Sequence, residues 1–149
     1  MKTAIVYYSQ HHGNTKKLLD AISARYEVTL INAAQTGNTS LEAYDRIGFA
    51  SGIYFSKFHK SVLQFAERNL PENKEVFFLY TYGAKKDSYT QSIVEIVKKK
   101  SARILGGFGC LGFDTFGPFK LVGGIAKGRP DQADCEDAVR FYSGLSSET

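Results

Sequence analysis

Apolar runs and amphipathic segments alternate along the whole chain. Between the apolar runs, apolar residues repeat every three or four positions, as Leu18, Leu19 and Ile22 do. Near-continuous apolar runs are typical of strands that helices cover on both faces. The runs predict five strands, at residues 3–8, 27–31, 45–50, 75–80 and 102–108.

Strands that alternate with helices predict an α/β fold, a doubly wound parallel sheet between two layers of helices. A length of 149 residues fits a single domain over residues 1–149. Ligands of such sheets bind beyond the carboxyl ends of the strands, where the strand order reverses. The loops after the first, third and fourth predicted strands are therefore the candidates for a binding site.

Residue patterns predict the position of two of the helices. After the third strand, Phe58, Val62 and Phe65 fall on one stripe of a helix that Pro71 ends. Near the carboxyl terminus, Pro130 and Asp131 are typical of a helix start, with Asp131 as the N-cap.

Charge and cysteine content exclude some functions. The net charge is +4, but lysine and arginine are spread along the chain, and we read Lys98–Lys100 as a solvated helix end rather than a nucleic-acid site. Cys110 and Cys135 lack the spacing of a metal site, so we expect two reduced thiols. No apolar stretch approaches the length of a membrane span. We therefore expect a cytoplasmic protein without a membrane span, a metal site or a nucleic-acid partner.

A polar loop at residues 9–15 follows the first strand directly and leads into a helix. Free backbone N–H groups at a helix start, flanking hydroxyls and a glycine favour a phosphate. The pattern of nucleoside-triphosphate-binding loops, which includes a lysine, is absent. The loop therefore predicts a phosphomonoester site, formed by Ser9, Gln10, His11, His12, Gly13, Asn14 and Thr15.

Aromatic residues and a glycine follow both the third and the fourth strand, at residues 51–56 and 81–89. Aromatic faces bind planar rings by stacking. These two loops therefore predict the walls of a site for a planar aromatic ring. The residues concerned are Ser51, Gly52, Ile53, Tyr54, Phe55, Thr81, Tyr82 and Gly83.

The triplet Gly13-Asn14-Thr15 resembles the end of the phosphate loop of flavodoxins, and the two aromatic loops resemble their flavin-binding loops. Gln10, His11 and His12 depart from the hydroxyl-rich family pattern but keep hydrogen-bond donors. The resemblance covers nearly the whole chain. It implies a flavodoxin-like fold with the strand order 2-1-3-4-5 and one non-covalent FMN. Since the chain has no tryptophan, we expect Tyr54 and Tyr82 to stack on the flavin.

The resemblance implies an electron carrier between partner redox proteins, a flavodoxin or ferredoxin reductase and an acceptor enzyme. The alternative is an FMN-dependent oxidoreductase, such as a quinone reductase or an enzyme like protoporphyrinogen dehydrogenase. Residues 54–60 resemble the corresponding region of the latter, where His59 would be a proton donor or a plain surface residue of the helix. We expect a carrier rather than a self-sufficient enzyme. Classical flavodoxins are acidic, so a charge of +4 implies an acidic partner or a locally acidic face.

Other modules of this fold fit the residues less well. A phosphoacceptor domain needs carboxylates for magnesium after the first and third strands, where this chain has Gln10, His11, Ala50 and Ser51. Residues 107–112 match the dinucleotide pattern G-x-G-x-x-G, but we expect them to follow the last strand without opening a helix. Neither magnesium nor a nicotinamide dinucleotide is therefore expected.

Overall fold

The computed structural model describes residues 1–10, 13–35, 39–84, 86, 88–112 and 128–146. Its strands are β1 (Thr3–Tyr8), β2 (Thr29–Asn32), β3 (Arg46–Tyr54), β4 (Lys57–Phe58), β5 (Glu75–Tyr82) and β6 (Arg103–Leu111). Its helices are α1 (Asn14–Ser23), α2 (Lys60–Asn69), α3 (Gln91–Lys99) and α4 (Gln132–Ser146).

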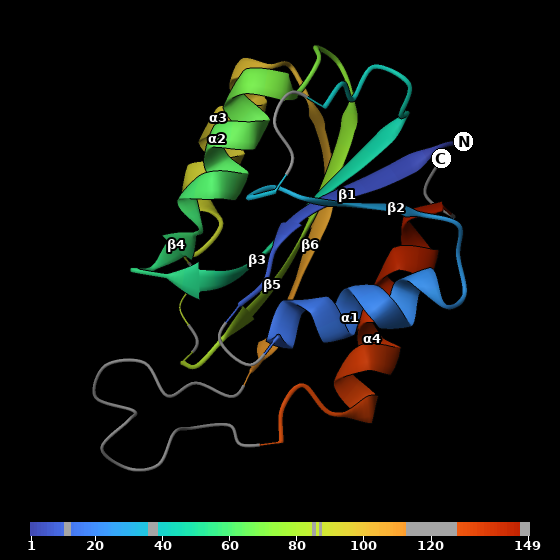
Figure 1. Ribbon diagram of the computed structural model, residues 1–149, viewed down its shortest axis with the longest axis vertical. Helices are drawn as coiled ribbons and strands as arrows, with labels where there is room; N and C mark the ends of the chain where they lie inside the picture. The colour runs from blue at the N-terminus through green and yellow to red at the C-terminus, as the bar shows by residue number, and fades with distance from the viewer. Residues whose placement is uncertain (11–12, 36–38, 85, 87, 113–127, 147–149) are drawn as a thin grey trace.

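The main sheet is parallel and has the order β2-β1-β3-β5-β6, with β4 paired to β3 in the antiparallel direction. Figure 1 shows three layers, in which α2 and α3 cover one face of the sheet and α1 and α4 cover the other. The predicted α/β class and the order of the five parallel strands are confirmed. The sequence did not predict the sixth strand, β4.

The alternation of side chains along the buried strands separates two apolar clusters. Phe78 packs with Phe49 and Val62 on the side of α2, whereas its neighbour Phe77 packs with Leu18 and other residues on the side of α1 and α4. Full burial of one such side chain contributes about 1.5–3 kcal/mol. Because both faces of the sheet are covered, its strands carry few polar residues.

A hairpin at the end of β3 corrects the prediction that Phe58 belongs to a helix. Phe55 and Ser56 have φ angles of 51° and 66° and reverse the chain, so that Tyr54 pairs with Lys57. Turns of this kind usually contain Asn-Gly, because both central residues need positive φ. Phe-Ser gives no such signal, and the sequence therefore missed the turn. Helix α2 begins two residues later than the stripe suggested, with His59 as its N-cap.

The last strand is longer than predicted. β6 continues beyond Phe108 to Leu111, so the first five residues of the G-x-G-x-x-G match lie inside a strand. No helix among the described residues is long and apolar enough to cross a membrane.

Candidate functional site

Helix α1 begins with a glycine in a left-handed conformation. Gly13 is the N-cap, with φ 65° and ψ 27°, and as a glycine it has no side chain with which to cap the helix. Ser9 Oγ accepts a hydrogen bond from the Lys16 backbone N–H at 3.1 Å, which folds the loop against the first turn. This turn contains no acidic residue. The positive end of the helix dipole therefore meets no carboxylate of its own first turn.

Two residues predicted for the site are hydrogen-bonded across the fold. Thr15 Oγ1 in the first turn of α1 lies 3.0 Å from Thr81 Oγ1 near the end of β5, and both residues are buried. This contact links the predicted phosphate loop with the loop after β5. Because both residues are buried, the two hydroxyls are hydrogen-bonded to each other rather than to solvent.

The residues described in the polar loop suit an anion with several oxygen atoms. Backbone N–H groups of the first turn, the Ser9 and Thr15 hydroxyls and the dipole of α1 all favour negative charge. Gln10 is exposed beside them. His11 and His12, which the sequence also predicts here, lie outside the described residues. The donors that are described fit a phosphomonoester.

The β3–β4 hairpin carries the predicted residues of the second loop. Ser51 is buried; its Oγ accepts a hydrogen bond from the His59 backbone N–H at 3.0 Å and donates one to the Gly52 carbonyl at 2.5 Å. Phe55, at the tip of the hairpin, is 82% exposed. Ser51 therefore ties the end of β3 to the start of α2, and the hairpin projects from that junction.

A cluster of three rings forms beside this hairpin. Tyr8 and His59 stack with their centroids 3.6 Å apart and their planes 6° apart, and the Tyr54 ring meets both edge-on, at 5.8 and 5.0 Å. Tyr54, one of the two residues expected to stack on a flavin, thus packs against protein rings. Stacking of Tyr54 on a flavin therefore stays a prediction.

The tautomer of His59 follows from its capping role. Its Nδ1 accepts a hydrogen bond from the Ser61 backbone N–H at 3.1 Å, so the proton of the neutral ring lies on Nε2. Burial, and then the charge of Lys60, lower the pKa of His59 below its ordinary value of 6.5. This stack could not be predicted from the sequence, because a ring contact between β1 and a helix cap leaves no local pattern. His59 is half-buried and not the plain surface residue that the sequence allowed.

Tyrosines also gather at the end of β5. The Tyr82 ring lies 6.0 Å from that of Tyr80 and 5.9 Å from that of Tyr89, and the Tyr89 hydroxyl donates to the Ala84 carbonyl. These contacts hold the loop that contains Gly83 close to the sheet. Because β1, β3 and β5 are neighbours in the sheet, all three predicted loops meet at its carboxyl edge (Figure 1).

Packing explains the glycines of the dinucleotide-like segment. A Cβ on Gly109 would lie 2.3 Å from the Tyr80 ring, and one on Gly112 would lie 2.7 Å from Asn14 Nδ2. Gly107 has no such neighbour within 3.8 Å. Two of the three glycines therefore make room for side chains of the sheet and of α1, which accounts for the match without a nucleotide.

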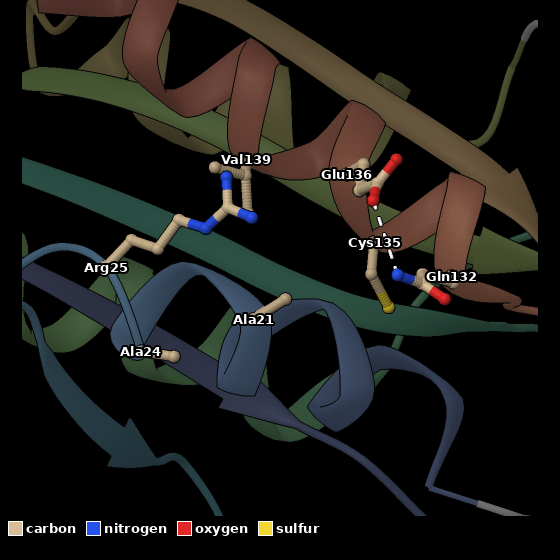
Figure 2. A pocket seen from close by; sticks show the side chains of 7 residues that line it. All are labelled: Ala21, Ala24, Arg25, Gln132, Cys135, Glu136 and Val139. Atoms are coloured by element: carbon tan, nitrogen blue, oxygen red, sulfur yellow. Dashed lines mark hydrogen bonds between the residues drawn. The ribbon is translucent and has the colours of Figure 1, made fainter.

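A shallow groove lies elsewhere, between α1 and α4 (Figure 2). Arg25, Cys135 and Val139 are among its lining residues. In Figure 2 the Cys135 sulfur points toward α1, and the Gln132 amide meets the Glu136 carboxylate at 3.4 Å. Burial raises the pKa of the Cys135 thiol. The other thiol, Cys110, is buried in the sheet, and this burial raises its pKa to about 12. Neither thiol has the lowered pKa of a reactive cysteine.

Known proteins share both the sequence pattern and the fold. The chain is 38% identical to an uncharacterized protein of Methanocaldococcus jannaschii, over 97% of this chain and 98% of that protein. A solved archaeal flavodoxin has a TM-score of 0.71 at 18% identity, covering 98% of this chain and 97% of its own. Flavodoxin 1 of Bacillus cereus has a TM-score of 0.72 at 15% identity, covering 99% of both chains.

General stress protein 14 of Treponema denticola, solved in complex with FMN, has a TM-score of 0.64 at 14% identity, covering 97% of this chain and 99% of its own. The family model described as a flavodoxin domain matches residues 5–112, which run from within β1 to the end of β6 and include the three loops at the carboxyl edge. The chain belongs to the flavodoxin family.

Proposed function

We propose that this protein binds one FMN without a covalent bond and carries electrons between redox partner proteins in the cytoplasm. The observation that carries the proposal is the start of α1, where Gly13 caps the helix, no acidic residue lies in the first turn, and Thr15 is hydrogen-bonded to Thr81. This arrangement would offer backbone N–H donors to a phosphate. It also joins the phosphate loop to β5, and the loop after β5 would hold the flavin ring.

The phosphate of FMN would be held by backbone N–H groups and hydroxyls of the first loop. A dianionic phosphate is stabilised there by the dipole of α1, without magnesium. We assign this role to Ser9, Gln10, His11, His12, Gly13, Asn14 and Thr15, of which the two histidines are proposed from the sequence alone.

The isoalloxazine ring would lie between the hairpin and the loop after β5. Their aromatic side chains supply stacking surface and exclude water from the ring. We assign this role to Ser51, Gly52, Ile53, Tyr54, Phe55, Thr81, Tyr82 and Gly83. Tyr54 and Tyr82 remain the proposed stacking residues, and the exposed ring of Phe55 is available beside them. Bound FMN would supply the redox chemistry, since it exchanges one or two electrons.

The relatives support this proposal in two ways. Two of the similar structures are flavodoxins, and a third was solved with FMN bound. Their low sequence identity to this chain shows a common fold, and the cofactor is therefore inferred from the residues at the loops.

The state of His59 favours a carrier over an FMN-dependent quinone reductase or an enzyme like protoporphyrinogen dehydrogenase. An enzyme that reduces a quinone needs a proton donor near the flavin. His59 is a described candidate beside the hairpin, but its Nδ1 is held by the Ser61 backbone N–H, its ring is stacked on Tyr8, and burial lowers its pKa, which disfavours the protonated form. A carrier exchanges electrons alone and therefore needs no such proton donor.

Two measurements on the purified protein test the proposal. After loading with FMN and reduction by dithionite, we expect rapid reoxidation by a one-electron protein acceptor such as cytochrome c. We expect no turnover of NADPH with a quinone when a separate reductase is absent. Sustained NADPH–quinone turnover by the protein alone would favour the enzyme, and a protein that takes up no FMN would refute both functions.

A further inference from the structure

Charges at the two edges of the sheet differ in their position relative to the loops proposed to hold the flavin. At the amino edge, cations and carboxylates pair: the buried Arg46 lies 3.2 Å from Glu75, and Arg103 lies 3.5 Å from the same carboxylate. Asp45 accepts a hydrogen bond from the Lys2 backbone N–H at 2.8 Å. Arg46, Arg103 and Glu75 thus form one paired group at this edge, where the exposed Lys98 and Lys99 at the end of α3 also lie.

At the carboxyl edge, lysines surround the three loops. Four exposed lysines form what we call the basic rim: Lys17, Lys57, Lys60 and Lys86. Within the described part of the chain, none of them forms an ion pair. The other described cations of this edge, Lys16 and Arg129, are paired with Asp20 and Asp134, at 2.7 and 2.5 Å. Among the described residues of this edge, these four lysines are thus exposed cations outside any ion pair, whereas Arg129 also lies 3.6 Å from Asp131.

Three members of the rim flank the loops proposed to hold the flavin ring. Lys57 is in β4, Lys60 is the first residue of α2, and Lys86 follows β5. In Figure 1, β4 and the start of α2 lie at the lower end of the layer formed by α2 and α3, whereas the end of α3 lies at the upper end of this layer. Lys98 and Lys99 are in the last turn of α3. The two groups of lysines therefore occupy opposite edges of the sheet.

The position of the rim lysines is unfavourable for the helices themselves. Lys17 and Lys60 lie in the first turns of α1 and α2, where the positive end of the helix dipole disfavours a cation. Neither of these first turns contains an acidic residue, and α3 has none in its first turn either. Helix stability therefore does not account for lysines at these two places, which points to a role outside the fold.

We infer that the basic rim is a docking surface for an acidic face of the redox partner protein. The inference rests on the proposed function, because it places the partner over the loops that would hold the flavin. The hairpin supports a protein partner, because it carries the exposed Phe55 ring as well as Lys57, and apolar residues with a charged rim are typical of protein interfaces. Opposite charges across such a surface accelerate encounter at low salt.

Small charged oxidants measure the charge around the flavin edge directly. The FMN-loaded protein, reduced by dithionite and freed of excess reductant, passes one electron to ferricyanide, an anion, or to tris(phenanthroline)cobalt(III), a cation. We expect the ferricyanide rate to fall with added salt and the cobalt rate to rise. In the triple variant Lys57→Gln/Lys60→Gln/Lys86→Gln, the ferricyanide rate at low salt should fall roughly tenfold.

The matched control is Lys98→Gln/Lys99→Gln/Lys100→Gln, which removes the same charge at the opposite edge. We expect its ferricyanide rate to stay within about twofold of the unmodified protein, because its charges lie more than a Debye length of about 10 Å from the loops. Equal effects of the two triple variants would overturn the inference, since net charge alone would then explain the rates.

A second readout does not depend on FMN. Cytochrome b5, whose haem edge is acidic, is added to the isotope-labelled protein, and the amide NMR signals are followed. We expect shifts at Lys57, Lys60 and Lys86 that 0.5 M salt abolishes. Shifts confined to Lys98–Lys100, or none at all, would overturn the inference, as would tighter binding of duplex DNA than of cytochrome b5. Failure of FMN loading with these shifts present would refute the proposed function alone.

Discussion

Helices α1 and α4 both begin at the carboxyl edge of the sheet, but their first turns are stabilised differently. At α4, Asp131 Oδ1 accepts from the Asp134 backbone N–H and Asp134 Oδ2 accepts from the Asp131 backbone N–H, each at 2.9 Å. Arg129 adds two hydrogen bonds to the Asp134 carboxylate, at 2.5 and 2.7 Å. At α1, a glycine caps the helix without a side chain.

The difference explains why the start of α4 has a structural role, whereas the start of α1 is the proposed binding site. The carboxylates of α4 satisfy its N–H groups and neutralise its dipole, so an external anion has little to gain there. The first turn of α1 has no carboxylate, and its hydroxyls lie at its border. We therefore propose that an anionic ligand binds at the start of α1 rather than at the start of α4.

A carboxylate at the start of α1 should have the largest effect. Asn14→Asp keeps the size of the side chain but places a negative charge where the phosphate is proposed to bind. Unit charges about 4 Å apart repel by about 4 kcal/mol at an effective dielectric constant near 20. Part of this repulsion is screened by solvent, so we expect about a hundredfold weaker FMN binding in a fluorescence titration.

The control for this charge is Gln132→Glu, which adds the same charge to the first turn of α4. It should leave the FMN dissociation constant unchanged within about twofold, since the screening length is about 10 Å. An equal loss in both variants would remove the distinction between the two helix starts.

Removal of the Asp134 carboxylate should weaken the fold and spare the ligand. Asp134→Asn breaks the capping pair and the bond to Arg129, which we expect to cost about 2 kcal/mol of unfolding free energy in urea. Asp137→Asn, in the exposed middle of the same helix, should cost under about 0.5 kcal/mol. A large loss of FMN affinity in Asp134→Asn would contradict a purely structural role for α4.

The carboxylate of Asp134 also makes the free energy of unfolding depend on pH in the acid range. The hydrogen bond from Arg129 lowers the pKa of Asp134 below its ordinary value of 3.8. A carboxyl group whose pKa is lower in the folded state stabilises the fold above the unfolded pKa and loses this effect as the pH falls through the folded pKa. We expect Asp134→Asn to remove part of the loss of stability measured by urea unfolding below about pH 4.

A methyl group beside Asn14 should have a smaller effect. In Gly112→Ala the new Cβ would lie 2.7 Å from Asn14 Nδ2, so this side chain must move. We expect FMN binding to weaken about fivefold, near 1 kcal/mol. Gly107→Ala, whose Cβ would have no neighbour within 3.8 Å, is the matched control and should bind FMN normally. Normal binding by both variants would argue against a role for Asn14.

The start of α2 is intermediate between the starts of α1 and α4, because the neutral side chain of His59 caps it. The pKa of His59 should lie below 6.5 in an NMR titration, and Lys60→Gln should raise it, because it removes a nearby positive charge. Lys57→Gln is the control and should leave it unchanged. Because the folded pKa is the lower one, His59 stabilises the fold above pH 6.5 and less as the pH falls through the folded pKa. A His59 pKa above 6.5 would contradict the neutral cap.

Local patterns in the sequence were sufficient for the five parallel strands and the loops that follow them, because buried parallel strands are almost continuously apolar, whereas the sheet order came from the resemblance to flavodoxins. Asp131 was also predicted correctly as a cap. The hairpin was missed since Phe55 and Ser56 adopt positive φ without glycine or asparagine. The Thr15–Thr81 bond and the Tyr8–His59 stack join residues far apart in sequence, and no local pattern encodes such contacts.

The central claim is that the first turn of α1 holds the phosphate of FMN, and parallel titrations of flavin-free protein with FMN and riboflavin test it most directly. Riboflavin has the same ring but no phosphate. The account predicts one FMN per chain and at least about a hundredfold weaker binding of riboflavin, a difference of about 2.7 kcal/mol. Equal affinities for the two flavins, or no uptake of FMN from excess, would contradict it.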